Sequence, residues 1–245
     1  MTPSELIELG ETDPASITIH ITDEPVPPAT RAVVECWDAM RTDKPRLFNG
    51  PVLSYTGHRG SEITVRRDSY QRLAVQEREP AIVNPPVMQL SVTGVVTALD
   101  DRAVRHVLVG RRSHATRVYG GMWEFGPSGG IDPPPSSVDT LDGLRVFEQL
   151  ASEMQEETGL RVDAEPGPII AITVDRIATS ADLVMRLELS RPINEIVAQT
   201  NRPREHDWEY EATQWIPCSG IRRFAIESPC IPPTIALATL VEALA

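Results

Sequence analysis

Residues 123–160 read WEFGPSGGIDPPPSSVDTLDGLRVFEQLASEMQEETGL, and this stretch decides the fold. It begins with three residues typical of a short strand, continues through a loop with paired glycines, and ends in apolar residues at helical spacing. We expect a helix over Val138–Thr158, with Gly159 as its C-cap. Four apolar residues form the predicted core-facing stripe of this helix: Leu144, Phe147, Ala151 and Met154.

Three glutamates near the end of the predicted helix are the candidate catalytic and metal-binding residues. Glu153, Glu156 and Glu157 project from one side, where like charges destabilise a helix by a few tenths of a kcal/mol per pair. A divalent cation would offset this repulsion, because carboxylate oxygens suit Mg²⁺ or Mn²⁺, ions that also hold substrate phosphates. The competing interpretation is a solvated acidic face, which the E-x-x-E-E pattern alone favours.

The segment SEMQEETGL, residues 152–160, resembles the signature of the Nudix hydrolase family, G-x5-E-x7-R-E-U-x-E-E-x-G-U with U aliphatic. It agrees at every defined position except the arginine, where this chain has Ser152. The resemblance implies a Mg²⁺ or Mn²⁺ cofactor held by the three glutamates, the first of which serves as the base in some members. It also implies that the backbone carbonyl of Gly130 is a metal ligand.

The chain departs from the family signature in two ways. Gly130 and Ser152 lie 22 positions apart where the family pattern has 14, so the loop with Pro133–Pro135 carries an insertion of about eight residues. The first signature glutamate falls by count on Leu144. The short neutral side chain of Ser152 also cannot orient the glutamates as the family's arginine does. Either another arginine substitutes for it or the activity is reduced.

In these departures and in its long N-terminal extension, the chain is similar to a Nudix subgroup, Nudix-type motif 22, that cleaves UDP-glucose and UDP-galactose. In the extension the resemblance is carried by residues 37–39, 45–51 and 68–72. It implies hydrolysis of a nucleoside diphosphate linked to another moiety, with a UDP-sugar giving UMP and sugar 1-phosphate. The alternative is a non-catalytic Nudix-fold module that binds a nucleotide and regulates a partner, an interpretation supported by Ser152.

Arginines and aromatic residues are candidates for binding this substrate. Arg111 and Arg112 follow a predicted strand near the glutamates, and a guanidinium can bond two phosphate oxygens at once. Trp123 is the first candidate for stacking on a base. The second choices are Arg59, Arg66 and Arg67 for phosphate and Phe48, Tyr55 and Tyr119 for stacking. For each of these residues a surface or core role is the competing interpretation.

The segment with His206, Glu209 and Glu211 lies where Nudix enzymes often place an extra catalytic acid. A plain surface acid is an equally good interpretation of each of these positions. The other histidines have no metal-ligand spacing.

The remaining sequence predicts an α/β (α+β) fold: a Nudix α/β/α sandwich with a mixed sheet, preceded by an N-terminal α+β extension. We divide it into residues 1–85, the extension, and 86–245, the Nudix hydrolase domain, because Glu77–Pro86 is proline-rich. The expected strands are 16–22, 52–56, 62–66, 89–99, 105–111, 122–125, 169–174, 183–189 and 210–216. Further helices are expected from Ala29 to before Pro45, over 193–200 and over 234–244.

Composition restricts the function. The 245 residues carry a formal charge of −12, which disfavours binding to nucleic acid or to anionic membranes. Lys44 is the sole lysine, so a P-loop or a Schiff-base lysine is nearly excluded. Three cysteines without a C-x-x-C pair fit a reducing cytoplasm. We expect a small-molecule substrate, no export signal and no membrane span; the sequence leaves the oligomeric state open, with a homodimer as one option.

Overall fold

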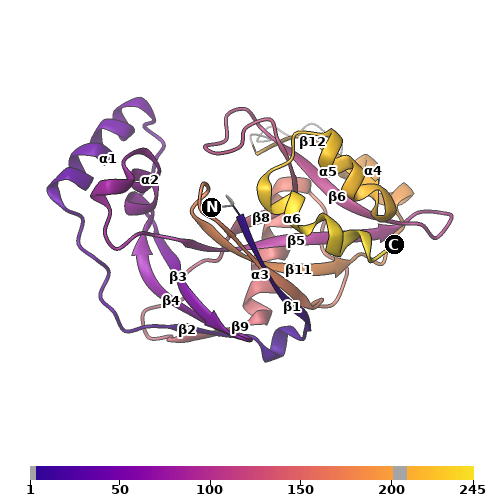
Figure 1. The fold of residues 1–245 in the computed structure, drawn as a ribbon, viewed down its shortest axis with the longest axis horizontal. Helices are drawn as coiled ribbons and strands as arrows, with labels where there is room; N and C mark the ends of the chain where they lie inside the picture. Colours follow the sequence, from indigo (N-terminus) through magenta and orange to yellow (C-terminus); the bar gives the residue numbers. More distant parts are fainter. Residues whose placement is uncertain (1–3, 201–208) are drawn as a thin grey trace.

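A computed structural model describes residues 4–200 and 209–245, in which 12 strands form one mixed sheet (Figure 1). The strands are β1 Ser4–Thr12, β2 Thr18–Ile21, β3 Pro51–Arg59, β4 Glu62–Ser69, β5 Gln89–Leu99, β6 Arg105–Arg112, β7 Trp123–Phe125, β8 Ser128–Gly130, β9 Thr140–Asp142, β10 Ile169–Asp175, β11 Ser180–Glu188 and β12 Tyr210–Pro217. The α-helices are α1 Arg31–Asp43, α2 Tyr70–Arg78, α3 Gly143–Glu153, α4 Ile193–Thr200, α5 Ile221–Glu227 and α6 Pro232–Glu242. Short helical turns are η1 Pro14–Ser16, η2 Pro80–Ile82, η3 Met154–Thr158 and η4 Cys218–Gly220.

Strand β5 lies at the centre of this sheet. One of its edges pairs in parallel with β11, from Gln89 opposite Ser180 to Thr97 opposite Glu188. Its other edge pairs in turn with β3, β8 and β6. Both β10 and most of β11 are buried apolar runs, as expected for strands covered on both faces.

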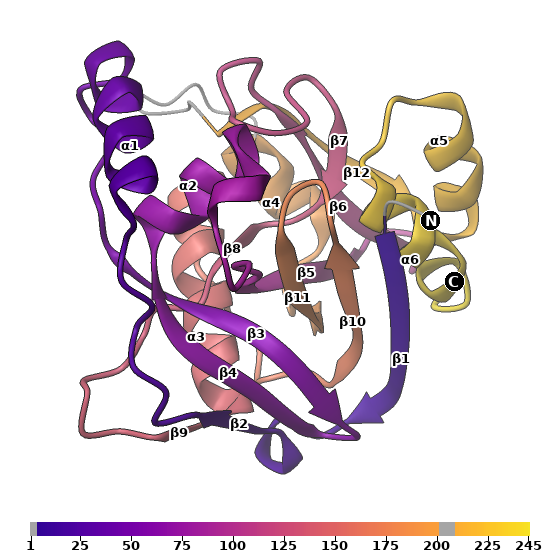
Figure 2. The same ribbon diagram turned by 60° about the vertical axis from the view of Figure 1, so that its left-hand side comes forward.

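Helices cover both faces of the sheet, so the predicted mixed α/β sandwich is confirmed. On one face α3 packs in a core that includes Val92 and Leu183. On the other, α5 and α6 pack against Val95 and Val184, the neighbours of opposite parity on the same strands. Figure 2 shows α3 and α6 on different sides of β5 and β11. None of the described helices is long and apolar enough to span a membrane.

The N-terminal residues join the same sheet. Strand β1 pairs antiparallel with β10, and β2 pairs with both β4 and β9. Helices α1 and α2 lie at one end of the molecule (Figure 1), over a smaller core that contains Trp37 and Leu73. The sheet is thus continuous across residue 85, and the division of the chain there into two units stays a prediction.

The helix expected over Val138–Thr158 is shorter and changes its hydrogen bonding. It begins after Asp142, whose carboxylate accepts from the backbone N–H groups of Leu144 and Arg145, and residues 140–142 form β9 instead. The last turn, η3, is a π-helix that ends at Gly159, where φ is +69° as expected for a C-cap.

The prediction that Leu144 belongs to the core-facing stripe of this helix is wrong, because its side chain is 44% exposed. Val146, Leu150 and Met154 form the buried face instead.

Five strands and α-helices were not expected from the sequence: β1, β8, β9, α2 and α5. The sequence of β1, SELIELGET, has three acids among nine residues and no regular alternation of apolar and polar positions. The buried residues of α2 include two polar side chains, Arg72 and Gln76, so its apolar periodicity is weak. The other predicted elements are confirmed with shifts of a few residues at their ends, as is usual.

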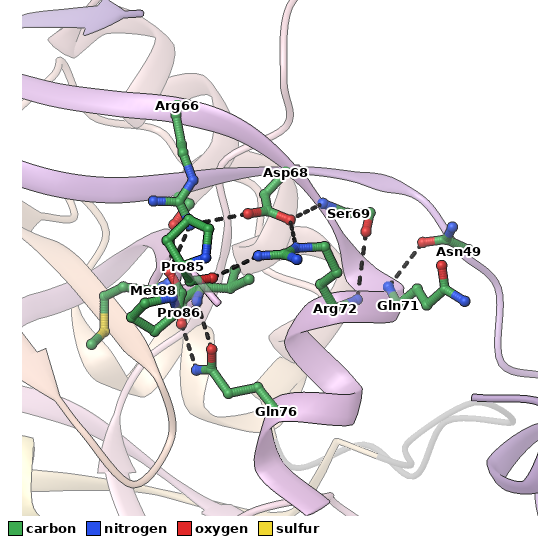
Figure 3. A network of polar contacts seen from close by, with 12 residues as sticks. Asn49, Arg66, Asp68, Ser69, Gln71, Arg72, Gln76, Pro85, Pro86 and Met88 are labelled. Carbon is green, nitrogen blue, oxygen red and sulfur yellow. Dashed lines mark hydrogen bonds and ion pairs between the residues drawn. The ribbon is translucent and has the colours of Figure 1, made fainter. Parts of the chain in front are cut away.

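A buried ion cluster attaches α2 to the start of β5 (Figure 3). The carboxylate of Asp68 is fully buried and accepts from Arg66 Nη2 at 3.1 Å and from Arg72 Nε at 2.9 Å. Each arginine donates a further bond of 2.6 Å to a backbone carbonyl, Arg66 to that of Pro86 and Arg72 to that of Pro85. The amide of Gln76 bonds both backbone groups of Val87. The chain that leads into β5 is therefore held by side chains from β4 and α2.

We predict that Asp68→Asn lowers the free energy of unfolding by about 3–5 kcal/mol, because it leaves two buried guanidinium groups without their counter-charge. Urea denaturation of the variant and the wild type measures this difference. Asp43→Asn, an exposed acid at the end of α1, is the control and should stay within about 0.5 kcal/mol. A loss below 1 kcal/mol in Asp68→Asn would contradict the role assigned to this cluster.

Candidate active site

The predicted metal-binding glutamates lie beside the paired glycines. A side chain built at Gly129 would collide with the carboxylate of Glu153, and one built at Gly130 would collide with the amide of Gln89. A larger residue at either position would displace one of these side chains, and the two collisions lie on opposite faces of β8. The close approach of β8 to the helix brings the loop and the glutamates together, as the sequence pattern predicts.

Each of the three glutamates has its own hydrogen-bond donor. Gln149 donates to Glu153 Oε1 at 2.9 Å, and the backbone N–H of Ser128 donates to Glu157 Oε2 at 3.3 Å. The hydroxyl of Ser152 donates to Glu156 Oε1 at 2.8 Å. The expectation that Ser152 cannot orient a glutamate is therefore wrong for Glu156, because a single turn of helix brings the two side chains within reach.

Two further acids, which sequence reasoning missed or left open, complete an acidic cluster. Glu124, from the middle of β7, is 3% exposed and accepts two bonds from Arg112 Nη1, at 2.7 and 2.8 Å. Glu209, which precedes β12, interacts through its charge with Arg112 and Glu156. We call Glu124, Glu153, Glu156, Glu157 and Glu209 the acidic cluster.

Burial and mutual repulsion raise the pKa values of four acids of this cluster, Glu124, Glu153, Glu157 and Glu209. The pKa of Glu157 lies well above its ordinary value because its carboxylate is desolvated and close to the charges of Glu209, Glu124 and Glu153. Desolvation, with repulsion from Glu156 and Glu209, raises the pKa of Glu153 to about 7. Desolvation also raises the pKa of Glu124, and Arg112 opposes that shift.

This donor set fits a divalent cation. Within residues 4–200 and 209–245, no three His, Cys, Asp or Glu side chains already converge as a metal site, since the glutamates turn to separate donors. The charges of Glu124, Glu153 and Glu209 nevertheless act on Glu157, whereas Arg112 lowers the pKa of Glu124 and Glu209 alone. A hard divalent ion would supply the missing positive charge. The ligand roles of Gly130, Glu153, Glu156 and Glu157 stay a prediction.

Tyr210 reaches into the same region. Its ring lies where side chains at Gly110 and Gly126 would otherwise be, and its hydroxyl is buried without a hydrogen bond of ordinary geometry to the described residues. Desolvation and the charges of Glu124 and Glu157 raise the pKa of Tyr210 well above its usual range. The phenol therefore stays protonated and can act as a donor within the acidic cluster.

Two cavities adjoin the acidic cluster. The inner cavity, of about 220 Å³, lies over β5, β8 and β11, and Ser128, Gly129 and Glu124 are among the residues that line it. The outer cavity, of about 900 Å³, lies between residues 44–48 and residues 112–117. Both are lined by Arg112, Arg117 and Glu209, so a ligand at these three residues could extend into either.

The structure separates the predicted substrate-binding residues. Arg112 lines both cavities, although its guanidinium is paired with Glu124. Arg111 points to the other face of β6, where it pairs with Glu211 at 3.5 Å and lies over the ring of Trp123. Trp123 is only 8% exposed and packs edge-on against Phe224. Arg111 and Trp123 are therefore not brought to the cavities, because neighbouring residues of a strand face opposite sides.

The second-choice arginines either bond other parts of the chain or lie at the surface. Arg66 belongs to the Asp68 cluster, Arg67 donates to the carbonyls of Pro134, Pro135 and Val138 in the inserted loop, and Arg59 is exposed at a hairpin end. Glu211 is occupied by Arg111 and by the backbone of His114. Of the predicted extra acids, Glu209 alone is thus found beside the glutamates; His206 lies outside the described residues.

Sequence reasoning missed Glu124 and Asp182. Glu124 is a single acid between Trp123 and Phe125 in a strand that is buried throughout. An acid between two aromatic residues of a short predicted strand indicates a charge with a functional role, because burying it is costly. Asp182 is 8% exposed within the apolar run of β11, and desolvation raises its pKa to about 7. The charges of Glu124 and Asp175 act in the same direction.

No model of a protein family matches the sequence, and no curated protein sequence matches it significantly. Solved structures with similar folds include RenU, a Nudix hydrolase from M. smegmatis, at 14% identity and a TM-score of 0.45 over 64% of this chain and 85% of that one. DR0079 from Deinococcus radiodurans is 12% identical with a TM-score of 0.47, over 78% and 99% of the two chains. NrtR from Shewanella oneidensis, solved with a 27mer DNA, is 15% identical with a TM-score of 0.39, over 63% and 61%. At these values the function has to be argued from the site itself.

The raised pKa of Asp182 predicts how stability depends on pH. The native state keeps a proton on this group up to about pH 7, whereas the unfolded chain releases it near 3.8, so its contribution to stability falls as the pH rises through that window. Asp182→Asn should flatten the curve, gaining roughly 4 kcal/mol over the wild type between pH 4 and 8. Urea denaturation across this range measures the gain.

The exposed acid Asp101 in the turn after β5 gives the control for this measurement. Asp101→Asn should follow the wild-type curve. Parallel curves for Asp182→Asn and the wild type would show that Asp182 is ionised at the same pH in both states.

Proposed function

We propose that this chain is a Nudix hydrolase, a Mg²⁺- or Mn²⁺-dependent pyrophosphohydrolase that cleaves a nucleoside diphosphate linked to another moiety. The observation that carries the proposal is the crowding of Glu153, Glu157 and Glu124 beside the glycines of β8. Buried carboxylates that repel one another reduce stability unless a cation binds. The spacing of the glutamates in residues 152–160 is also that of the Nudix signature.

Glu153, Glu156, Glu157 and the carbonyl of Gly130 would hold the ion, which supplies Lewis-acid stabilisation of phosphate charge and activates water. As in those members of the family in which the first of these glutamates is the base, Glu153 would accept the proton of the attacking water. The water oxygen bonds to one phosphorus of the diphosphate. The bond from that phosphorus to the bridging oxygen breaks, and the bridging oxygen leaves with the other phosphate.

The outer cavity supports an anionic substrate. Although the chain carries a charge of −12, this cavity is lined by Lys44, Arg46, Arg112 and Arg117. The guanidinium of Arg117 lies over the ring of Tyr70, 5.6 Å from its centroid, and pairs with Glu77 at 2.8 Å. A nucleotide phosphate at this rim would be held by Lys44 and Arg46 while its base packs on an aromatic residue.

Phe48, which is 78% exposed on the wall of the outer cavity, is the best-placed aromatic residue for that base. We therefore infer that the segments quoted for the N-terminal resemblance contribute to substrate binding. With a UDP-sugar as substrate, the products would be UMP and sugar 1-phosphate.

A binding module that regulates a partner is the second candidate. It is favoured by the serine at the position of the signature arginine and by the separate hydrogen-bond partners of the three glutamates. Such a module would bind the nucleotide without releasing products. The experiments below separate the two functions.

We expect the wild type to release UMP and glucose 1-phosphate from UDP-glucose with Mg²⁺, and Glu157→Gln to lower kcat by roughly 100-fold or more, because a metal ligand is lost. Coupled detection of both products measures this. Glu148→Gln is the matched control, an exposed glutamate on α3 that pairs with Arg145. Equal rates in all three proteins would refute the catalytic assignment. UDP-, ADP-, GDP- and CDP-linked compounds identify the preferred base.

Metal binding has a readout that does not depend on activity. Saturating Mg²⁺ or Mn²⁺ should raise the Tm of the wild type by roughly 5–10 °C, the effect of a ligand at a hundredfold excess over its Kd. The double variant Glu153→Gln/Glu157→Gln should have a higher Tm than the wild type without added metal, since repulsion is removed, and should lose the metal-induced shift. Glu148→Gln should retain that shift. An undiminished shift in the double variant would place the ion elsewhere.

A further inference from the structure

The inner cavity has a floor of polar side chains from two adjacent parallel strands. On β5 these are Gln89, Ser91 and Thr93, and on β11 they are Ser180 and Asp182. Because residues two apart share a face, and because Gln89 lies opposite Ser180 and Ser91 opposite Asp182, all five side chains project into the same space. Parallel strands covered on both faces are normally apolar, so five such residues on one face require an explanation.

Several polar groups of this floor can form further hydrogen bonds. Ser91 is 6% exposed, and in the described part of the chain neither its hydroxyl nor the amide of Gln89 makes a hydrogen bond. Asp182 accepts from Ser180 Oγ at 2.8 Å and from Thr93 Oγ1 at 3.4 Å. No arginine, lysine or histidine of the described residues pairs with Asp182. Its carboxyl therefore retains lone pairs for a ligand.

The lining excludes two classes of ligand. A phosphate would meet the carboxyl groups of Glu124, Asp175 and Asp182, while Arg112 and Arg117 are already paired with Glu124 and Glu77. A planar base would lie on a floor of hydrogen-bonding side chains, because the apolar residues of the lining, among them Phe125 and Leu237, come from other elements. A neutral group rich in hydroxyls can both donate to the carboxyl groups and accept from Ser91 and Gln89.

Size and position agree with a sugar ring. A cavity of about 220 Å³ is smaller than a site for a drug-sized ligand and accommodates one ring-sized group. It adjoins the acidic cluster at Ser128 and Gly129, and it shares Arg112, Arg117 and Glu209 with the outer cavity. A diphosphate at the acidic cluster would thus have its nucleoside on the outer side and its other substituent on the inner side.

We propose that the inner cavity is the subsite for a glycosyl group, with Asp182 and its partners on β5 binding the sugar hydroxyls. This inference rests on the proposed function and assigns its substrate specificity to one wall of the site. Asp182 is a specificity residue here, remote from the bond that breaks. When such a polar site loses a donor or an acceptor, the binding of a ligand with the matching hydroxyl weakens much more than the binding of a ligand that lacks it.

The test compares UDP-glucose with the β-methyl ester of UDP, which shares the nucleotide and the diphosphate but lacks the sugar. We expect the ratio of kcat/KM for UDP-glucose to that for the methyl ester to fall at least tenfold in Asp182→Asn. It should fall several-fold in Thr93→Val. Thr97→Val is the matched control: Thr97 lies on the same face of β5, bonds the carbonyl of Leu187 and does not line the cavity. Its ratio should stay within twofold of the wild type.

The outcomes distinguish this inference from the proposed function. If the wild type cleaves both compounds and the ratio is unchanged in Asp182→Asn and Thr93→Val, the subsite is refuted while the hydrolase stands. If the wild type cleaves neither these compounds nor the ADP-, GDP- and CDP-linked ones, the hydrolase is refuted, and calorimetry with UDP-glucose and the methyl ester decides the subsite. Binding of UDP-glucose that weakens at least tenfold in Asp182→Asn, relative to the methyl ester, would support it; no difference would overturn it.

Discussion

The buried carboxylate of Asp68 is the interaction on which the rest of the structure depends. An ionised carboxylate out of water needs a counter-charge, and the two that it has, Arg66 and Arg72, are themselves buried. Each arginine also donates to a backbone carbonyl, that of Pro85 or Pro86, so the path into β5 follows from the geometry of this ion cluster. Strand β5 then pairs with β11, β3, β8 and β6.

The buried acids of this chain fall into two groups with different energetics. Asp68 and Glu124 each face a guanidinium, whereas Glu153, Glu157 and Asp182 lie among other acids and have raised pKa values from burial and repulsion. A fold gains no stability from the second group. Buried acids that reduce stability are expected at a binding site, where a metal ion or a polar substrate supplies the missing positive charge or hydrogen bond. The uncompensated acids adjoin or line one cavity system, and this coincidence links electrostatics to the proposed function.

The N-terminal residues illustrate how far the sequence could be interpreted. Alternation in ITIHIT and helical spacing around Trp37 predicted β2 and α1 correctly. The helix α2 was missed because two of its buried residues are polar: Arg72 and Gln76 bond the chain before β5, and apolar periodicity cannot reveal such a contact. The inserted loop was found by counting residues, but its attachment to Arg67 and the pairing of β9 with β2 depend on partners 67 or more residues distant.

By itself the sequence determined the local features: the strand, glycine loop, helix and cap of residues 123–160, the three glutamates on one side of the helix, and the mixed α/β class. These depend on short-range periodicity and backbone preferences, which neighbouring residues express directly. Tertiary structure alone decided that Arg112 faces the cavities while Arg111 and Trp123 do not, and that Glu124, Tyr210 and Asp182 lie near the glutamates. Strand parity relative to the core and pairing between distant segments determine which side chains meet, and both are properties of the assembled sheet.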